Sequence, residues 1–462
     1  MCAKYLPLII TCLSTIAVAA PNYPFPQKAN YSGNIISETN SADVIQKYYE
    51  GWVTEYYEEN SDGKLARIRF DKPEKTVSEG IGYGMLIMAY MENEKNKTQA
   101  KFDKLWAYYK NFPDDNGLMH WRIIGFDSAD AFNAATDAEV DVVLALIMAY
   151  KQWGDEKYLT NARWLAEKIL KHEVNDNNQL VSGDAYTNRL NPSYFSIVAM
   201  EMCRHIEITT DEGVRERWKK VIDNSYSIIR KSRDQSTGGL PDWTNLEGEP
   251  DAPFMGYDAI RVPWRMAWAY AWFGHPEAKE ICDKISNNAV TQGTIRQDRT
   301  YIGAFALSAM TDSTKKVWMK DRYNDLNKVN EKADTYFGHT LNILYQLLMT
   351  GNMPNLYAQT PNAVIIPVSK TSNTLSLDIV SEQNSSQVKL SFHISSASMV
   401  NLAILDSKGR IVSSVAQNRF FSKGEHTITQ SLNSSKRLAK GVYFAHLTSG
   451  DNRISKKFVI SR

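Results

Sequence analysis

Three acidic residues that stand at or beside predicted helix starts are the main candidates for chemistry in this 462-residue chain. Glu79 lies in the segment SEGIGYGM at 78–85, among three glycines that would let another group approach the backbone closely. The same pattern also suits an ordinary helix start, with Ser78 as the N-cap and an acidic side chain favoured by the helix dipole. A phosphate-binding loop is disfavoured, because no Lys follows at the required position and the spacing is not GxGxxG.

Asp137 belongs to the acidic cluster ATDAEVD at 135–141, which opens a strongly apolar helix. Its carboxylate could cap the helix, or it could face a cleft and bind sugar hydroxyls or the ring carbon that becomes positive in the transition state. A calcium site is disfavoured because the spacing lacks the EF-hand pattern.

Asp258 lies in FMGYDAIRVPWR at 254–265, an acid followed by two arginines and flanked by large rings. Asp258 and Arg261, three residues apart, are expected on one helix face, where they could form a structural ion pair. Hydrolysis of a glycosidic bond needs one carboxylic acid to protonate the leaving oxygen and one carboxylate to attack or to activate water. The chain therefore offers enough acids for this chemistry.

The overall charge is close to neutral. Lys and Arg total 53 against 52 for Asp and Glu, a formal net charge of +1, so no global field favours nucleic acid or an anionic membrane. Aromatic residues make up 11% of the chain, including 11 Trp and 24 Tyr. Most such rings belong to cores, but some could stack on sugars.

Between residues 41 and 350 the apolar pattern is repeatedly helical, with Pro, Gly, Asn and Asp breaking one helix from the next. No repeat of fixed short period is present, which favours a closed barrel or bundle of helical hairpins over an open solenoid. The predicted helices are 42–57, 80–92, 98–112, 138–153, 158–172, 193–208, 214–231, 262–273, 301–309 and 338–349.

The two ends of the chain differ from this helical part. Residues 1–20 have the pattern of a signal peptide, and no later apolar stretch is long enough to span a membrane. The remaining cysteines, Cys203 and Cys282, could be buried free thiols or one disulfide. Residues 354–371 form a predicted linker, and 372–462 a small all-β sandwich with strands at 375–380, 387–392, 400–405, 441–447 and 457–460.

Taken together, four dispersed segments resemble glycoside hydrolase family 8, which contains endoglucanases, lichenases, xylanases and chitosanases. These segments are SEGIGYGM at 78–85, ATDAEVD at 135–141, NPSYF at 191–195 and YDAIRVPWR at 257–265. The resemblance implies an all-α catalytic domain over 21–353, a closed barrel of six helical hairpins.

The resemblance also implies roles for individual residues. Glu79 would be the general acid and Asp258 the base that activates water in an inverting mechanism, with Asp137 holding the sugar at the cleavage point. Tyr194 and Arg261 would bond around that sugar and orient the base. Sugar platforms are expected at Trp121, Trp243, Tyr336 and Phe337. The chain departs from the family pattern at Glu139, where the family usually has Asp.

The C-terminal segment 372–462 resembles the sorting domains of the type IX secretion system of certain Gram-negative bacteria; a generic carbohydrate-binding sandwich is the alternative. A secreted or cell-surface bacterial enzyme is therefore expected, with partners limited to a polysaccharide and the secretion machinery, no cofactor and no metal. The expected activity is endo-β-1,4-glucan hydrolysis of cellulose or mixed-linkage β-glucan. An endo-β-1,4-xylanase, a non-catalytic polysaccharide-binding protein and a polysaccharide lyase are the alternatives.

Overall fold

The computed structural model describes residues 21–292, 298–328, 335–358, 375–380, 387–394, 398–406, 411–431, 440–449 and 452–460. The chain divides into two compact units, Met1–Val364 and Ile365–Arg462, and each is described by itself. The predicted signal peptide at 1–20 lies outside the described residues, as does most of the predicted linker, from 359 to 371.

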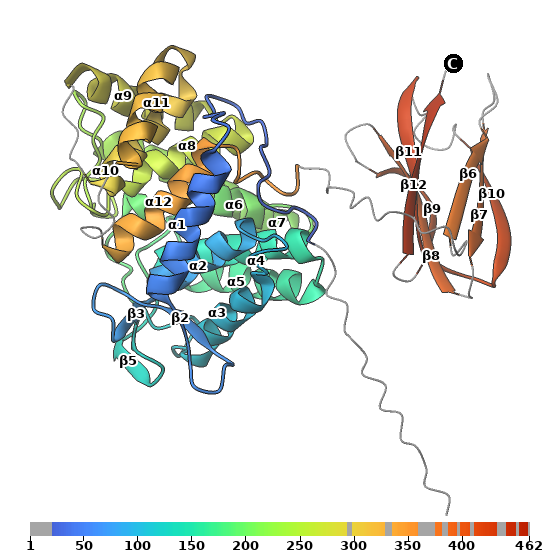
Figure 1. Ribbon diagram of the computed structural model, residues 1–462, viewed down its shortest axis with the longest axis horizontal. Coiled ribbons are helices and arrows are strands. Elements are labelled where there is room, and N and C mark those ends of the chain that lie inside the picture. Colours follow the sequence, from blue (N-terminus) through green and yellow to red (C-terminus); the bar gives the residue numbers. More distant parts are fainter. Residues whose placement is uncertain are drawn as a thin grey trace, which may run out of the picture. The chain divides into compact units, whose positions relative to one another are not determined.

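The first unit is helical (Figure 1). Its helices are α1 (Ser41–Tyr56), α2 (Ser78–Tyr90), α3 (Gln99–Asn111), α4 (Thr136–Trp153), α5 (Glu156–His172), α6 (Ile197–Cys203), α7 (Glu212–Ser232), α8 (Arg261–Phe273), α9 (Pro276–Gln292), α10 (Arg299–Ser308), α11 (Lys316–Leu326) and α12 (Tyr336–Met349). The predicted helices are all present, with shifted ends. The prediction for 193–208 was too long, because Pro192–Tyr194 forms a separate 3₁₀ turn and α6 ends at Cys203.

The helices differ in how much of their surface is buried. Every residue of α2 except Glu79 is buried, and α4 is buried along most of its length, as expected for helices that are apolar on all sides. In contrast, α5 and α7 have one apolar face and an exposed polar face, and each begins with an Asp cap, Asp155 and Asp211.

Helices far apart in sequence lie side by side in this unit. The first helix, α1, packs against the last, α12, and α12 also contacts α2 (Figure 1). Among the described helices, α2 and α4 have the most extensive contact with one another. A Cβ atom at Gly82 would lie 3.1 Å from the Cβ of Asp141, so glycine at this position permits the close packing of the two helices.

Short antiparallel strands, which the sequence patterns did not predict, connect some of these helices. Strand β1 (Tyr57–Glu59) pairs with β2 (Ala66–Ile68), and β4 (Arg122–Ile124) pairs with both β3 (Lys75–Val77) and β5 (Ser128–Ala131). Each has three or four residues, too few for an alternating pattern to be distinctive. Strand β3 leads directly into α2, so this small sheet fixes where α2 begins.

The second unit consists of two antiparallel sheets around one hydrophobic core. Their strand orders are β10-β7-β6 and β12-β11-β8-β9. The strands are β6 (Leu375–Val380), β7 (Gln387–Ile394), β8 (Ser398–Asp406), β9 (Ile411–Phe421), β10 (Gly424–Ser431), β11 (Gly441–Ser449) and β12 (Asn452–Ile460). The predicted β-rich C-terminal region is confirmed, although β9 and β10 were not predicted.

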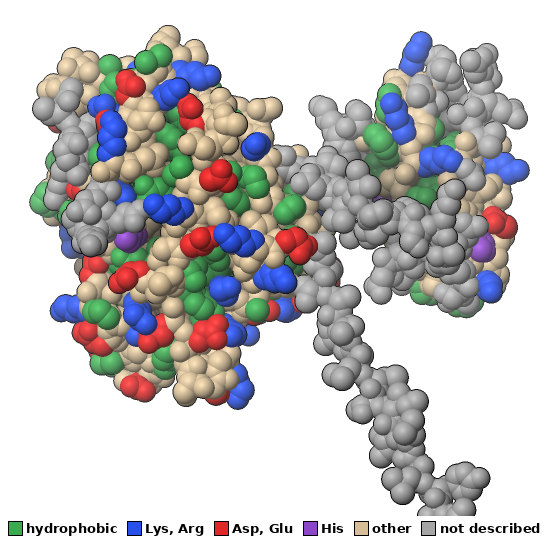
Figure 2. Space-filling view, in the orientation of Figure 1, with side chains coloured by type: hydrophobic (Ala, Val, Ile, Leu, Met, Phe, Trp, Pro, Cys, Tyr) green, Lys and Arg blue, Asp and Glu red, His purple; other side chains and the backbone are tan. Residues whose placement is uncertain are grey.

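The cysteines, the lengths of the apolar helices and the surface charge were each subjects of a prediction from the sequence. Cys203 and Cys282 are buried free thiols, so the disulfide alternative is wrong. Within the described part of the chain, no helix is both long and apolar enough to cross a membrane. Figure 2 shows basic and acidic side chains intermixed on the visible face, in agreement with the near-neutral net charge.

Candidate active site

The three acids singled out in the sequence converge on one arginine. The Nη1 atom of Arg261 donates to Glu79 Oε2 at 2.7 Å and to Asp137 Oδ2 at 2.9 Å. Its Nη2 atom donates to Asp258 Oδ1 at 2.6 Å. A single guanidinium group, 2% exposed at its side chain, thus connects three carboxyl groups that lie far apart in the sequence.

Glu79 and Asp137 are each positioned by the start of a helix. The backbone N–H of Ser78 donates to the carbonyl of Trp121 at 2.8 Å, which ties the first turn of α2, and therefore Glu79, to the β3–β4 sheet. Asp137 lies in the first turn of α4, whose Thr136 N–H donates to the carbonyl of Ser182. The predicted helix cap at Ser78 is wrong: Ser78 is already helical, and Val77 precedes it without a side-chain cap bond.

Asp258 was predicted to lie on a helix face with Arg261, but its backbone lies outside the helix. It lies in the turn before α8, which begins at Arg261, rather than on the helix itself. The turn closes through the Arg261 N–H, which donates to the Asp258 carbonyl at 3.1 Å. The expected ion pair with Arg261 therefore forms, but the Asp258 side chain extends from a turn and is 31% exposed, so a water molecule can reach it.

Burial separates the three acids electrostatically. Glu79 is 16% exposed at its side chain and Asp137 is 6% exposed, so both have lost most of their water. Burial raises the pKa of Glu79 to about 8, Asp137 and Asp258 add to the rise, and Arg261 opposes it. Burial also raises the pKa of Asp137. Since one guanidinium cannot neutralise three carboxylates, a proton on Glu79 relieves the excess negative charge.

Two tyrosine hydroxyls contact the group formed by Glu79 and Arg261. Tyr336 was predicted to be a sugar platform, but its ring is 1% exposed and offers no free face. Its hydroxyl instead donates to Glu79 Oε1 at 3.1 Å, and Gly80 gives it room, since a Cβ there would lie 2.8 Å from that hydroxyl. Tyr83 was not predicted as a site residue, but its hydroxyl accepts from Arg261 Nη1 at 3.3 Å.

Two of the other predicted residues place aromatic rings against Arg261. Arg261 Cζ lies 5.4 Å from the ring centre of Tyr194 and 5.8 Å from that of Phe337. Trp243 packs edge to face against Tyr194. The backbone carbonyl of Trp121 accepts the hydrogen bond from Ser78 N–H at the start of α2. Phe337, Trp243 and Trp121 are each partly exposed, as sugar-binding rings must be.

Tyr257 has a further partly exposed ring near the site and was not predicted from the sequence. It is 51% exposed and lies edge to face with Phe337. Its place directly before Asp258 was the available signal.

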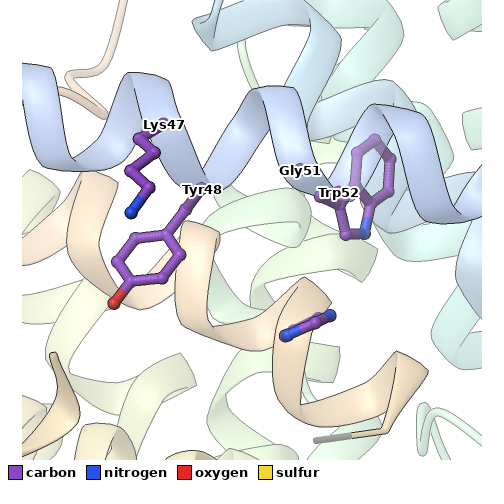
Figure 3. Close-up of a pocket in the computed structure, with 5 residues that line it drawn as sticks. Lys47, Tyr48, Gly51 and Trp52 are labelled. Atoms are coloured by element: carbon purple, nitrogen blue, oxygen red, sulfur yellow. The ribbon is translucent and has the colours of Figure 1, made fainter. Parts of the chain in front are cut away.

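A different location is unsuited to a sugar. Lys47, Tyr48, Gly51 and Trp52 of α1, together with His339 of α12, line a pocket of about 30 Å³ (Figure 3). A volume of this size holds one or two water molecules.

Among the described residues, no group of three or more His, Cys, Asp or Glu is arranged to hold a metal ion.

Comparison with known proteins gives the family of this chain. The family model described as glycosyl hydrolases family 8 matches residues 23–351. The chain belongs to glycosyl hydrolase family 8. As a family 8 member it is a glycoside hydrolase, which confirms the resemblance inferred from the four sequence segments.

Two relatives and one solved structure illustrate the similarity. Endoglucanase C of Ruminiclostridium cellulolyticum is 33% identical over 375 residues, covering 73% of this chain and 79% of that protein. Beta-glucanase of Niallia circulans is 28% identical over 389 residues, covering 73% and 93%. The solved structure of a beta-1,3-1,4-glucanase from Paenibacillus sp. X4 has a TM-score of 0.65 at 26% identity, covering 72% of this chain and 99% of that one.

The C-terminal unit of this family 8 protein has its own match. A model described as a secretion system C-terminal sorting domain matches residues 384–461. This match indicates a secreted or cell-surface bacterial protein, as the sequence analysis expected.

Proposed function

We propose that this glycoside hydrolase is an endo-β-1,4-glucanase that cleaves cellulose or mixed-linkage β-glucan with inversion at the anomeric carbon. The observation that carries the proposal is the arrangement around Arg261. It joins Glu79, a mostly buried acid with a raised pKa, to Asp258, a more exposed carboxylate. The two groups suit the two tasks of glycoside hydrolysis, proton donation and activation of water.

In this mechanism Glu79 protonates the glycosidic oxygen as the bond to the leaving sugar breaks. Its pKa of about 8 keeps it protonated at neutral pH, and the Tyr336 hydroxyl fixes one of its oxygens. Asp258 takes a proton from a water molecule, which attacks the opposite face of the sugar. Arg261 holds the Asp258 carboxylate in position through Oδ1.

Asp137 is assigned to the sugar at the cleavage point. Its Oδ2 is bound to Arg261, so its second oxygen is the one available to a sugar hydroxyl or to the positive charge that develops on the ring. The partly exposed rings of Trp121, Trp243, Phe337 and Tyr257 are proposed to stack on sugars of the bound chain.

The choice of a β-glucan is supported by the relatives named endoglucanase and beta-glucanase and by the beta-1,3-1,4-glucanase neighbour. The test is release of reducing sugar from carboxymethylcellulose, mixed-linkage β-glucan, xylan and chitosan, measured side by side with the purified protein. We expect activity on the first two substrates. Activity on xylan alone would replace the proposal with a xylanase, and binding without product would favour a non-catalytic polysaccharide-binding protein.

The architecture proposed for the catalytic unit is a closed barrel of six helical hairpins. Contacts of α12 with both α1 and α2, and the contrast between α2, buried except at Glu79, and the half-exposed α5 and α7, support an inner and an outer layer of helices. We propose domain limits of 1–20 for the signal peptide, 21–353 for the catalytic domain, 354–371 for the linker and 372–462 for the sorting domain.

A further inference from the structure

Two glutamates lie near the first turn of α4, which carries Asp137, and have no role in the mechanism above. Glu139 follows Asp137 by two residues, and Glu173 directly follows α5. Both side chains belong to residues with 0% exposure. Within the described residues neither carboxyl group forms an ion pair, although most buried acids require a cation.

Thr136 indicates where a proton must lie on Glu173. The Thr136 Oγ1 atom is 3.0 Å from Glu173 Oε1 and 2.8 Å from the carbonyl oxygen of Val181. A hydroxyl has one proton to donate, and a carbonyl oxygen can only accept. Both contacts are hydrogen bonds at the same time if Thr136 donates to Val181 and a protonated Glu173 donates to Thr136.

The surroundings of Glu139 favour the neutral form as well. Its Oε1 accepts from the Tyr109 hydroxyl at 2.8 Å, whereas its Oε2, like the Oε2 of Glu173, is buried without a hydrogen-bond partner in the described structure. A charged oxygen in that position would be very costly.

The titratable groups that face the pair are also acidic. They are Tyr109 from α3, Asp114 from the loop after α3, Asp137 from α4, and Asp184 from the loop after α5. Burial raises the pKa of both Glu139 and Glu173, and the neighbouring acids raise it further.

We propose that Glu139 and Glu173 are neutral carboxylic acids in the working enzyme and act as positioning residues for the first turn of α4. Glu173 holds Thr136, Glu139 anchors the turn to Tyr109 of α3, and Asp137 stands between Thr136 and Glu139 in the chain. This role rests on the proposed function of Asp137. Ionisation of the pair would place two like charges in a buried site and displace that turn.

The test compares glutamine and alanine at each position. Glutamine keeps the shape and neutrality of a protonated glutamate, so Glu139→Gln and Glu173→Gln should turn over β-glucan at close to the wild-type rate. Glu173→Ala removes the partner of Thr136 and should lower kcat by up to about 100-fold with little change in KM, because Asp137 is displaced. Glutamine variants as inactive as the alanine variants would overturn the proposal.

Two measurements that do not depend on activity separate this proposal from the proposed function. The first is the unfolding temperature against pH. Because the folded pKa values lie above the ordinary 4.5, the pair stabilises the fold fully below that pH, and this stability is lost as the pH rises toward the folded values. Each glutamine variant should therefore gain stability relative to the wild type as the pH rises. Variants whose curves stay parallel to the wild type contradict the proposal.

The second measurement is the infrared spectrum of the wild-type protein at neutral pH, which needs no variant to fold. The carbonyl band of protonated carboxylic acids should be present and should weaken in Glu139→Gln and Glu173→Gln; its absence in the wild type overturns the proposal. Glu92→Gln is the matched control, because Glu92 is also buried but its Oε2 accepts from two N–H groups, the backbone of Gln99 and the indole of Trp153. This variant should leave the protonated band unchanged.

Discussion

Asp141 and Arg265 form a fully buried ion pair with two parallel hydrogen bonds, Nη1 to Oδ1 at 2.5 Å and Nη2 to Oδ2 at 2.7 Å. Asp141 lies four residues after Asp137 on α4, and Arg265 lies four residues after Arg261 on α8. The two helices are therefore joined by two successive ion pairs, one turn apart. The pair Asp137–Arg261 belongs to the candidate active site. The pair Asp141–Arg265, called the inner pair below, fixes the distance between α4 and α8.

We expect that removal of one partner of the inner pair lowers the stability of the fold strongly, and that replacement of both partners by apolar residues does not. Arg265→Met leaves Asp141 charged and buried, and should lower the free energy of unfolding by about 3–5 kcal/mol. The double variant Asp141→Leu/Arg265→Met removes both charges and should recover most of that loss. Urea unfolding of the single and double variants measures the difference. A double variant as unstable as the sum of the two single variants would contradict this account.

Removal of either reacting carboxyl group should abolish most activity without unfolding the protein. Glu79→Gln and Asp258→Asn should each lower kcat on β-glucan by about 10²–10⁴-fold, the usual contribution of a general acid or base. Steady-state kinetics and the unfolding temperature are the measurements. Glu212→Gln, at the exposed start of α7, is the control and should keep the wild-type rate. Near-normal rates in either active-site variant would show that its role is assigned wrongly.

The activity should fall on the alkaline side as Glu79 loses its proton. With a pKa of about 8 the acid is protonated below that pH, so kcat/KM should decline above it. A rate that stays constant well beyond pH 8 would be inconsistent with Glu79 as the acid.

Tyr336→Phe is expected to move this alkaline limb upward. The Tyr336 hydroxyl bonds to the Glu79 carboxylate and lowers the pKa of Glu79, so its removal should raise that pKa. The measurement is the pH profile of kcat/KM for both proteins. A shift to lower pH would mean that the hydroxyl stabilises the neutral acid instead.

The stereochemistry of the product tests the role of Asp258. If Asp258 activates water, the first product released from a β-glucan should be the α-anomer, which proton NMR detects before mutarotation. A β-anomer as first product would indicate a retaining enzyme, in which Asp258 would not act as the base.

The C-terminal unit should be needed for export and not for catalysis. Deletion of residues 372–462 should leave kcat on soluble β-glucan unchanged, because every residue of the candidate site lies in the first unit, and should retain the protein inside the producing cell. Cell fractionation gives the location. Normal export of the truncated protein would exclude the sorting role, and loss of binding to insoluble polysaccharide would favour a binding module.

Local patterns in the sequence were sufficient for much of the helical unit and for its three acids. Apolar residues at helical spacing predicted α2, α4 and α8, and the acids at or before their first turns were visible as exceptions in otherwise apolar segments. The patterns missed α9 and α11. A signal was present in both, since the buried residues Ala278, Ile281, Cys282 and Ile285 of α9 and Met319, Tyr323 and Leu326 of α11 lie at helical spacing.

Other features depended on groups that are distant in the sequence. Nothing near Glu79 in the chain predicts that Tyr336, 257 residues away, donates to it, or that Arg261 is shared with Asp137. The place of Tyr336 was also misjudged, because a tyrosine that stacks on sugar and one that bonds a carboxylate look the same in sequence.

The sequence by itself thus determined which acids this protein has, which helices present them and, through four segments, its family. Only the tertiary structure decided how those acids differ from one another. Glu79 and Asp258 are both ordinary carboxyl groups in the unfolded chain, and packing buries the first and leaves the second open to water. Because burial penalises charge, the pKa of Glu79 rises to about 8, and a property of the folded protein makes one carboxyl group suited to be the acid.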